Sequence, residues 1–360
     1  MTAAFPVLQP EATIGILGGG QLGRMLALAA ARLGFKCHVF APAPDSPAFD
    51  VVHRVTCADY TDTAALDRFA ADVDVVTYEF ENVPAETATF LSARVNVLPD
   101  PAILATTQDR LAEKTFITGL GIGTAPFAPV SQPDELKAAI ARVGRPAVLK
   151  TRRLGYDGKG QATIANGGDP EAAWREVGGQ PCILEAFVPF AREVSVIAAR
   201  AHDGSIACFD VTENEHKDHI LKVSRVPAAL GEGDALKARQ IAETIAAKFG
   251  YVGVLAVEMF VLREGGLIVN EVAPRVHNSG HWTIDGASVS QFEQHIRAVA
   301  GWPLGRPVRH GRVEMTNLIG REVEDFRSWL AVPGASVHLY GKGAARPGRK
   351  MGHVTRVFAE

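Results

Sequence analysis

The strongest constraint on the fold is an alternation of short apolar runs and helical runs at the start of the chain. Residues 13–17 are apolar and are followed by Gly18-Gly-Gly-Gln-Leu-Gly23 and a helical run at 24–33. Residues 36–41 form a second apolar run, and the alternation continues up to about residue 100, with further strands expected at 73–79 and 95–98. Strand–helix–strand units place parallel strands side by side and cover the sheet with helices. We therefore predict an amino-terminal α/β domain with a Rossmann-like parallel sheet.

The first glycine motif, residues 18–23, allows three interpretations. A dinucleotide site would require an acidic residue at the end of the second strand, ~20 residues further on. Ala41-Pro-Ala-Pro44 stands there instead, and Asp45 falls in a proline-containing loop. Tight packing of a strand against a helix is the second interpretation. The third, which we favour, is an anion site in which backbone N–H groups near Gln21 and Leu22 hold a substrate phosphate.

The pattern changes after residue 106 from regular alternation to mixed strands and helices. Pro99-Asp-Pro101 indicates a linker, and helices are expected at 108–118, 133–143, 235–249 and 289–300. The segment from about 303 is rich in glycine, proline and arginine, with short strands. We therefore predict an α/β and α+β chain with domains at 1–106, 107–300 and 301–360.

A second glycine loop, residues 155–160, follows a strand that ends at Lys150. It has three glycines, one lysine and one acid, and Arg152 and Arg153 precede it. Glycines let a backbone fold over phosphates, and the basic side chains supply positive charge. A solvated hairpin turn would also suit Gly-Tyr-Asp-Gly, but a turn alone needs no cations. We predict a phosphate-binding loop.

A predicted hairpin, residues 252–272, brings two carboxylates together. If residues 263–266 form its loop, Leu262 faces Leu267, and Glu258 faces Glu271. Carboxylates opposed at roughly 5 Å destabilise a sheet unless a cation lies between them. Mg²⁺ prefers such oxygen ligands and accepts nucleotide phosphates as the rest of its shell, and Asn270 offers a further oxygen. A register shifted by one residue would instead leave one glutamate in solvent.

Three further segments combine polar groups. Glu185-Ala-Phe-Val188 follows a strand and Glu193 opens the next, a pattern that suits a purine edge and ribose hydroxyls. Residues 275–281 contain one cation, two imidazoles and an amide; a single histidine is usually structural, but this density favours a site. Residues 342–356 carry five basic side chains and no acid. A solvated basic face explains such a run as well as an anion-binding loop does.

Composition excludes several classes of protein. With 37 basic and 40 acidic residues the formal net charge is −3, which argues against a protein that coats nucleic acid or anionic membrane. No apolar run reaches the ~18–20 residues of a membrane span, and the first 23 residues have no Lys or Arg as a signal peptide would. The four cysteines form no CxxC pair. We therefore expect no disulfide frame or zinc site, and a cytoplasmic location.

Five motifs together resemble a known family. They are Gly18-Gly-Gly-Gln-Leu-Gly-Arg-Met25, Thr77-Tyr-Glu-Phe-Glu-Asn82, Gly155-Tyr-Asp-Gly-Lys-Gly-Gln161, Ala273-Pro-Arg-Val-His-Asn-Ser-Gly-His281 and Arg346-Pro-Gly-Arg-Lys-Met-Gly-His353. The chain resembles the ATP-grasp superfamily over nearly its whole length, and within it the 5-(carboxyamino)imidazole ribonucleotide synthetases. This resemblance implies a three-domain ATP-grasp architecture with a mobile small lobe at about 118–190, and a homodimer.

The resemblance also assigns roles to residues by position. ATP binding is implied for Arg110, Lys150, Gly155, Tyr156, Asp157, Gly158, Lys159, Gly160, Gln161, Glu185, Ala186, Phe187, Val188, Glu193, His216, Asn270 and Glu271. Mg²⁺ binding, to one or two ions, is implied for Glu258 and Glu271. Substrate binding is implied for Gly20, Gln21, Leu22, Glu79, Asn82, Arg275, His277, Asn278, Lys342, Arg349 and Lys350. A catalytic role is implied for Arg275, Lys350, Asn278 and Tyr156, whose loop would close as a lid.

The implied activity is ATP-dependent carboxylation of 5-aminoimidazole ribonucleotide by bicarbonate, through carboxyphosphate, in purine biosynthesis. Alternatives are a formate-dependent glycinamide ribonucleotide transformylase or another ATP-grasp ligase, an NAD(P)-dependent oxidoreductase, and a non-catalytic nucleotide sensor. Two departures from the family pattern are Leu154, where many relatives have glycine, and an end at Glu360. Leucine there is expected to stiffen the glycine loop.

Overall fold

The computed structural model describes residues 6–155 and 158–359. Its amino-terminal part is a parallel sheet of four strands in the order β3-β2-β1-β4. The elements are β1 (Thr13–Leu17), α1 (Gln21–Arg32), β2 (Lys36–Ala41), η1 (Phe49–Val51), β3 (Arg54–Cys57), α2 (Thr63–Ala71), β4 (Val75–Tyr78), α3 (Ala85–Ser92) and α4 (Pro101–Thr107). The predicted Rossmann-like α/β domain is thus confirmed, and β1 pairs with β2 and β4 on either side.

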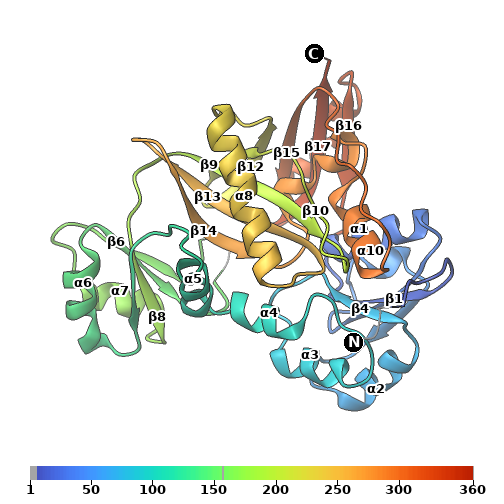
Figure 1. Cartoon of the computed structure of the whole chain (residues 1–360), viewed down its shortest axis with the longest axis horizontal. Coiled ribbons are helices and arrows are strands. Elements are labelled where there is room, and N and C mark those ends of the chain that lie inside the picture. The colour runs from blue at the N-terminus through green and yellow to red at the C-terminus, as the bar shows by residue number, and fades with distance from the viewer. Residues whose placement is uncertain (1–5, 156–157, 360) are drawn as a thin grey trace.

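A small lobe with a separate sheet follows and projects from the rest of the molecule, as the green segment of Figure 1 shows. Its strands take the order β5-β8-β6-β7. The helix α5 (Arg110–Gly119) leads into the lobe but packs with the large sheet, and the elements of the lobe are β5 (Phe127–Val130), η2 (Pro133–Glu135), α6 (Leu136–Val143), β6 (Ala147–Thr151), β7 (Gln161–Ile164), α7 (Pro170–Glu176) and β8 (Cys182–Ala186). The lobe has its own buried cluster, which includes Leu149, Ile164 and Leu184.

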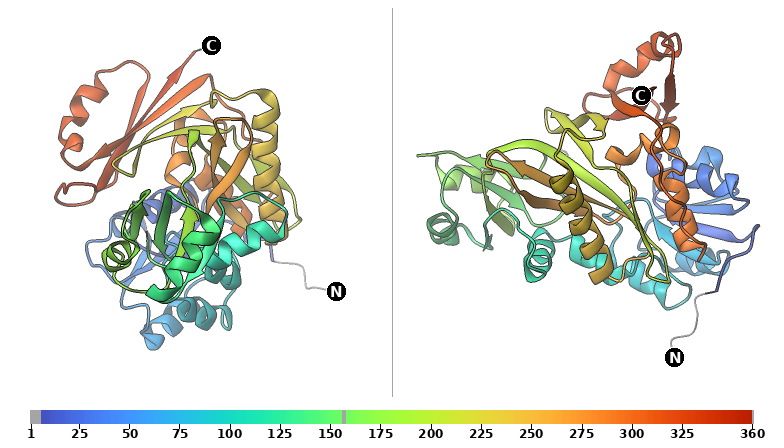
Figure 2. Two further views of the ribbon diagram at one scale, coloured as in Figure 1. Left: turned by 90° about the vertical axis from the view of Figure 1, so that its left-hand side faces the viewer. Right: turned by 45° about the horizontal axis from the view of Figure 1, so that its top comes forward.

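The remaining strands form one sheet with the path β14-β13-β9-β11-β12-β15-β17-β16, and β10 pairs with β9. The elements are β9 (Phe190–Arg200), β10 (Ile206–Cys208), β11 (Thr212–Lys217), β12 (Ile220–Val226), α8 (Glu232–Lys248), β13 (Gly253–Leu262), β14 (Leu267–Ala273), η3 (Asn278–Gly280), α9 (Thr283–Gly286), α10 (Gln291–Val299), β15 (Arg312–Ile319), η4 (Gly320–Asp325), α11 (Phe326–Leu330), β16 (Ala335–Leu339) and β17 (Lys350–Phe358). Figure 2 shows the carboxy-terminal strands rising from the side of this sheet, away from the small lobe.

Two local expectations are wrong. Residues 99–101 are no simple linker, because Asp100 caps α4 by accepting a hydrogen bond from the Ala102 N–H, and Pro101 is the first helical residue. Proline suits that position, since the N–H it lacks would have no partner inside the helix. Residues 95–98, expected as a strand, contribute only the isolated bridge between Val76 and Val97.

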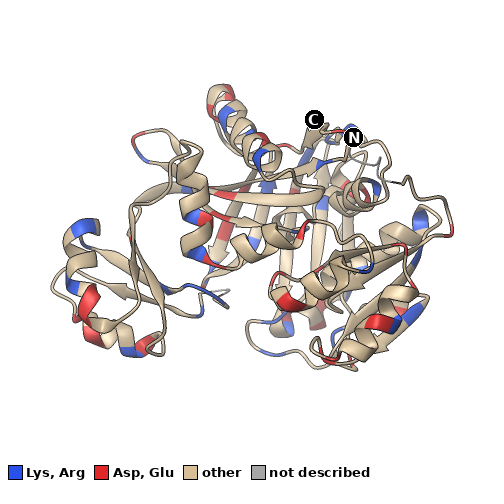
Figure 3. Ribbon diagram, turned by 60° about the horizontal axis from the view of Figure 1, so that its bottom comes forward, with Lys and Arg blue, Asp and Glu red and all other residues tan. Residues whose placement is uncertain are grey.

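A single buried cluster joins the amino-terminal sheet to the large sheet. Ile16 of β1, Val254 of β13, Trp282 and Met315 of β15 all belong to it. Among the described residues, no helix has the length and apolar character to cross a bilayer. Basic and acidic side chains both occur in the amino-terminal part, in the small lobe and around the large sheet (Figure 3), consistent with the small net charge.

Candidate active site

The paired carboxylates lie where the hairpin prediction placed them, because Glu258 of β13 faces Glu271 of β14. The predicted partner of Leu262 is wrong, however, since Leu267 pairs with Val261. The loop is therefore one residue longer than expected on the β13 side. A β-bulge between Glu258 and Met259 restores the register, with Asn270 as the extra residue on β14. Bulges of this kind re-aim side chains and are frequent beside active sites.

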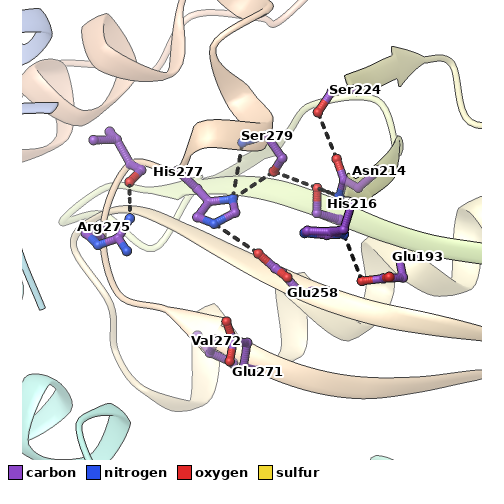
Figure 4. A network of polar contacts seen from close by, with 12 residues as sticks. Glu193, Asn214, His216, Ser224, Glu258, Glu271, Val272, Arg275, His277 and Ser279 are labelled. Atoms are coloured by element: carbon purple, nitrogen blue, oxygen red, sulfur yellow. Dashed lines mark hydrogen bonds and ion pairs between the residues drawn. The ribbon is translucent and has the colours of Figure 1, made fainter. Parts of the chain in front are cut away.

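Glu258 lies close to basic side chains (Figure 4). Its Oε1 is 2.9 Å from His277 Nε2. Burial alone would raise the pKa of Glu258, but the contact with His277 and the neighbouring His216 and Arg275 hold it at about 2. The carboxylate is therefore ionised at neutral pH and presents negative charge to the site.

Glu271 and Asn270 supply the other oxygens of the hairpin. Glu271 Oε2 accepts a 2.9 Å hydrogen bond from Arg110 Nη1. Asn270 Oδ1 is buried and has no hydrogen-bond partner among the described residues, and the backbone oxygen of Asn270 accepts from Lys114 Nζ at 3.1 Å. Two opposed carboxylates and an orphaned amide oxygen fit Mg²⁺, which needs few protein ligands when phosphates complete its shell.

Cations from the small lobe and from α5 meet one acidic residue, Glu185 of β8. Its Oε2 lies 2.9 Å from Lys150 Nζ and 3.5 Å from Lys114 Nζ. Burial opposes ionisation, but Lys150 and Lys114 outweigh it and hold the pKa of Glu185 at about 2. The chain thus places two lysines and Arg110 beside the hairpin, a charge arrangement suited to nucleotide phosphates.

The glycine loop of the small lobe is partly described. Gly155 O accepts a 3.4 Å hydrogen bond from Arg110 Nη2, which connects the loop to the hairpin cations. A Cβ at Gly158 would lie 2.7 Å from His219, so only glycine fits there. Leu154 adopts the left-handed conformation, with φ +63°, and its side chain is exposed. Tyr156 and Asp157 lie outside the described residues, and their roles stay predictions.

The rest of the loop begins β7, where Gln161 pairs with Lys150. The segment after β8 lies between the two lobes, with Phe187 exposed and its N–H bonded to Pro146 O at 3.0 Å. Ala186 ends β8, and Val188 O accepts from the Phe190 N–H. Glu193 Oε2 lies 3.1 Å from His216 Nδ1 on the large sheet. Glu193 raises the pKa of His216, although burial opposes that shift.

The amino-terminal glycine motif already holds an anion, the carboxylate of Glu79. Gly20 N–H donates to Glu79 Oε1 at 2.8 Å and Gly23 N–H donates to Oε2 at 3.0 Å. A Cβ at Gly18 would lie 2.4 Å from Glu79 Cγ. These N–H groups are therefore occupied, and the glycines make room for a side chain of the protein itself. Phosphate binding by Gln21 and Leu22 stays a prediction.

Arg275 and its neighbours line the side of the site nearest the amino-terminal domain. Its Nη2 donates to Glu81 Oε1 at 2.8 Å, and its Nε contacts Oε2, so the pair is bidentate. Arg275 holds the pKa of Glu81 at about 2 against the effect of burial. Asn82 follows Glu81 in a loop whose backbone oxygens at Glu81 and Val83 accept from Gln108. Asn278 is buried, and neither of its amide atoms has a partner among the described residues.

The basic residues of segment 342–356 lie in the loop between β16 and β17 and, for Lys350 and Arg356, in β17 itself. Lys342 Nζ donates to Lys350 O at 3.0 Å, and Arg349 Nη1 donates to Ala344 O at 3.4 Å. A Cβ at Gly341 would lie 3.5 Å from Asp50 and 3.6 Å from Arg24, so the loop rests against the amino-terminal domain. Lys350 lies close enough to oppose protonation of His216 and His281. The loop therefore reaches the site from the carboxy-terminal strands.

Sequence reasoning missed several residues of the site. Glu113 Oε1 accepts from the Val272 N–H at 3.0 Å, and Lys114 contacts both Glu185 and Asn270. Glu113 and Lys114 are buried together with Ile117 on α5. Two charged residues within helical spacing of a core isoleucine are the signal that could have found them.

Three family models match consecutive parts of the chain. They are a ribonucleotide synthetase preATP-grasp domain at 11–108, an ATP-grasp domain at 115–292 and a phosphoribosylaminoimidazole carboxylase C-terminal domain at 314–360. N5-carboxyaminoimidazole ribonucleotide synthase of Brucella melitensis is 52% identical over 97% of both chains. The protein of the same name from Pseudomonas aeruginosa is 49% identical over 95% of this chain and 93% of its own.

Solved structures agree with these matches. An ADP complex of N5-carboxyaminoimidazole ribonucleotide synthetase has a TM-score of 0.96 at 42% identity, covering 100% of this chain and 95% of the other. The synthase of Aspergillus clavatus, in complex with ADP and 5-aminoimidazole ribonucleotide, has a TM-score of 0.91 at 31% identity. That similarity covers 97% of this chain and 94% of the other.

Proposed function

The chain belongs to the N5-carboxyaminoimidazole ribonucleotide synthase family, and on that premise we propose how its site works. It is an ADP-forming, carbon–nitrogen bond-forming ATP-grasp ligase that carboxylates 5-aminoimidazole ribonucleotide in purine biosynthesis. The observation that supports the proposal is a pair of neighbouring ion pairs between the small lobe and the large sheet. They are Lys150–Glu185 and Arg110–Glu271. The oxidoreductase alternative is disfavoured, since Glu79 occupies the N–H groups that a dinucleotide phosphate would need.

We propose bicarbonate as the one-carbon substrate. A bicarbonate oxygen attacks the γ-phosphorus of ATP, the bond to the β,γ-bridging oxygen breaks, and ADP leaves with the electron pair. The exocyclic amine of the ribonucleotide then attacks the carbonyl carbon of carboxyphosphate, or the CO₂ it releases. Phosphate leaves, and the amine loses a proton. Phosphorylation is needed because bicarbonate is a poor electrophile, so the protein mainly aligns reactants and offsets charge.

Glu258 and Glu271 would hold Mg²⁺, with Asn270 Oδ1 next to them. The ion would neutralise charge on the phosphates during transfer. Lys150 and Arg110 would bind the phosphates of ATP, and Phe187 would cover the purine. Arg275 and Lys350 would hold carboxyphosphate, which Asn278, with its unpartnered buried amide, would help to orient. Lys342 and Arg349 would hold the phosphate of the ribonucleotide.

The test is ADP release by the purified protein with 5-aminoimidazole ribonucleotide, with and without added bicarbonate. We expect turnover to depend on both compounds. Activity with formate and glycinamide ribonucleotide instead, and none with bicarbonate, would move the assignment to the transformylase.

Three further properties stay predictions. We propose a homodimer from the resemblance alone, to be checked by sedimentation velocity. A cytoplasmic location is consistent with four free cysteines. We also retain the division into 1–106, 107–300 and 301–360, with the note that β15, β16 and β17 continue the large sheet.

A further inference from the structure

A chain of buried polar side chains leads from the middle of the large sheet to His277. Ser224 Oγ lies 2.9 Å from Asn214 Oδ1, and Asn214 Nδ2 lies 2.9 Å from Ser195 Oγ. Ser195 Oγ lies 2.7 Å from Ser279 Oγ, which lies 2.8 Å from His277 Nδ1. Figure 4 shows the chain ending at the imidazole that faces Glu258. Ser224, Ser195 and Ser279 are fully buried, so solvent does not compete for these bonds.

The donor and acceptor of each hydrogen bond in this network are determined by the contacts of His277. The backbone N–H of Ser279 points at His277 Nδ1 at 3.3 Å, and a peptide N–H can only donate. A hydrogen on Nδ1 would therefore face the N–H of Ser279. At the other ring nitrogen, Nε2 faces a carboxylate oxygen of Glu258 at 2.9 Å, which can only accept. Both contacts require the imidazole hydrogen on Nε2.

The placement of the imidazole hydrogen on Nε2 determines every other donor in the network. Because Nδ1 accepts, the Ser279 hydroxyl donates to it and its oxygen accepts from Ser195. The Ser195 oxygen then accepts from the amide nitrogen of Asn214, whose Oδ1 accepts from Ser224. The hydroxyls of Ser279 and Ser195 thus each give one hydrogen and receive one.

We propose that Ser279, Ser195 and Asn214 are positioning residues that fix the His277 tautomer, so that His277 donates to Glu258 and orients this carboxylate. The residues come from three separate elements, η3, β9 and β11. Gln291 supports the same arrangement, because its side-chain amide bonds both the N–H and the backbone oxygen of His277, at 2.9 and 2.6 Å. Outer partners of metal-binding groups commonly act in this way.

The inference rests on the proposed role of Glu258, but its first test needs neither substrate nor metal. The two ring nitrogens of His277 are observed by ¹⁵N NMR of the nucleotide-free protein with labelled histidine, and assigned by comparison with His277→Gln. We expect a lone pair on Nδ1 and a hydrogen on Nε2. A hydrogen on Nδ1, or averaging between the two nitrogens, would overturn the proposal. Absence of bicarbonate-dependent ADP release by the wild type would instead contradict the proposed function.

The second test uses an isosteric change, Asn214→Asp, to reverse the direction of the hydrogen bonds in this network. A carboxylate at 214 accepts from both Ser224 and Ser195, so the Ser279 hydroxyl turns towards Ser195 and leaves Nδ1. We expect the His277 spectrum to change and kcat/KM for MgATP to fall on the order of tenfold or more.

The matched control is Asn317→Asp, a buried amide on β15 whose Nδ2 bonds Leu221 O at 2.9 Å and which has no role in the proposed site. It places the same carboxylate in the same sheet, so we expect a lower Tm with unchanged kinetic constants and an unchanged His277 spectrum. Equal kinetic losses in both variants, or an unchanged His277 spectrum in Asn214→Asp, would assign the effect to buried charge and overturn the proposal.

Discussion

At the residue scale, the ion pair between Arg275 and Glu81 is one source of acid sensitivity in the protein. Both side chains are largely buried, and the pair is bidentate. The pKa of Glu81 is held at about 2, below its usual 4.5. A depressed carboxyl pKa contributes stability that is complete above the unfolded value and is lost as the pH falls towards the folded value.

We therefore expect Glu81→Gln to lower the free energy of unfolding by about 2–3 kcal/mol at pH 7, because Arg275 is left without its anion. The variant should also lose part of the pH dependence of stability between about pH 4.5 and pH 2. Urea denaturation at several pH values measures both effects. Glu86→Gln, an exposed residue of α3, is the control. A parallel loss of stability in the two variants at every pH would contradict the assignment.

Substitution of Glu271, also at the residue scale, tests the proposal that Glu258 and Glu271 hold Mg²⁺. Glu271→Gln keeps the shape of the side chain but removes the charge that faces Glu258 and Arg110. We expect turnover to fall by at least 10–100-fold while the fold is retained. Circular dichroism and ADP release measure the two parts. Glu264→Gln, at the exposed tip of the same hairpin, should be near wild type, and near-normal turnover of Glu271→Gln would refute the metal role.

At the element scale, the hairpin shows what a sequence can predict and where it fails. The facing of Glu258 and Glu271 is confirmed, yet the loop is one residue longer than the spacing predicts, and the spacing does not predict the bulge at Asn270. The two errors compensate beyond the bulge. Alternation of apolar residues indicates which face a side chain takes, but a bulge depends on contacts such as that between Lys114 and Asn270, which come from a distant helix.

The strand–helix connection at Gly18 gives an element-scale prediction. Gly18 and Gly265 both have positive φ, but a Cβ at Gly18 would meet Glu79, whereas one at Gly265 would meet open space. Gly265→Ala should therefore show only the backbone cost, about 1 kcal/mol. Gly18→Ala should lose about 1–3 kcal/mol more, from steric overlap. Equal melting temperatures would show that Glu79 does not need the glycine.

At the scale of the whole molecule, the site is assembled from parts that no short motif connects. The sequence indicated Arg275 through a family motif, Lys150 through its place at the end of a strand before a glycine loop, and Glu258 through the spacing of the hairpin. The hydrogen-bonded network from Ser224 to Ser279 was missed, since Ser195, Asn214 and Ser224 lie on separate strands and carry no local signal, although Ser279 lies in a family motif. Only the pairing of β9 with β11, and of β11 with β12, brings them together.

For the whole molecule, the division into separate buried clusters predicts two unfolding transitions. The small lobe has its own core, whereas one buried cluster extends across both the amino-terminal sheet and the large sheet, in addition to a further cluster in each. Parts with a common core unfold together, and a lobe with a separate core can unfold earlier. We expect calorimetry to show a smaller transition at lower temperature, from the small lobe.

MgATP should raise the lower transition most, because Lys150 and Glu185 belong to the small lobe and Arg110 and Glu271 to the other side of the nucleotide site. A ligand that binds only the folded state stabilises by RT ln(1 + [L]/Kd), so the shift should grow with MgATP concentration. Lys150→Met removes a cation of the small lobe and should reduce that shift. Hydrogen exchange in β6 and β8 assigns the transition to its segment. A single transition that moves as a whole, with exchange slowing equally in β1 and β8, would mean that the lobes form one cooperative unit.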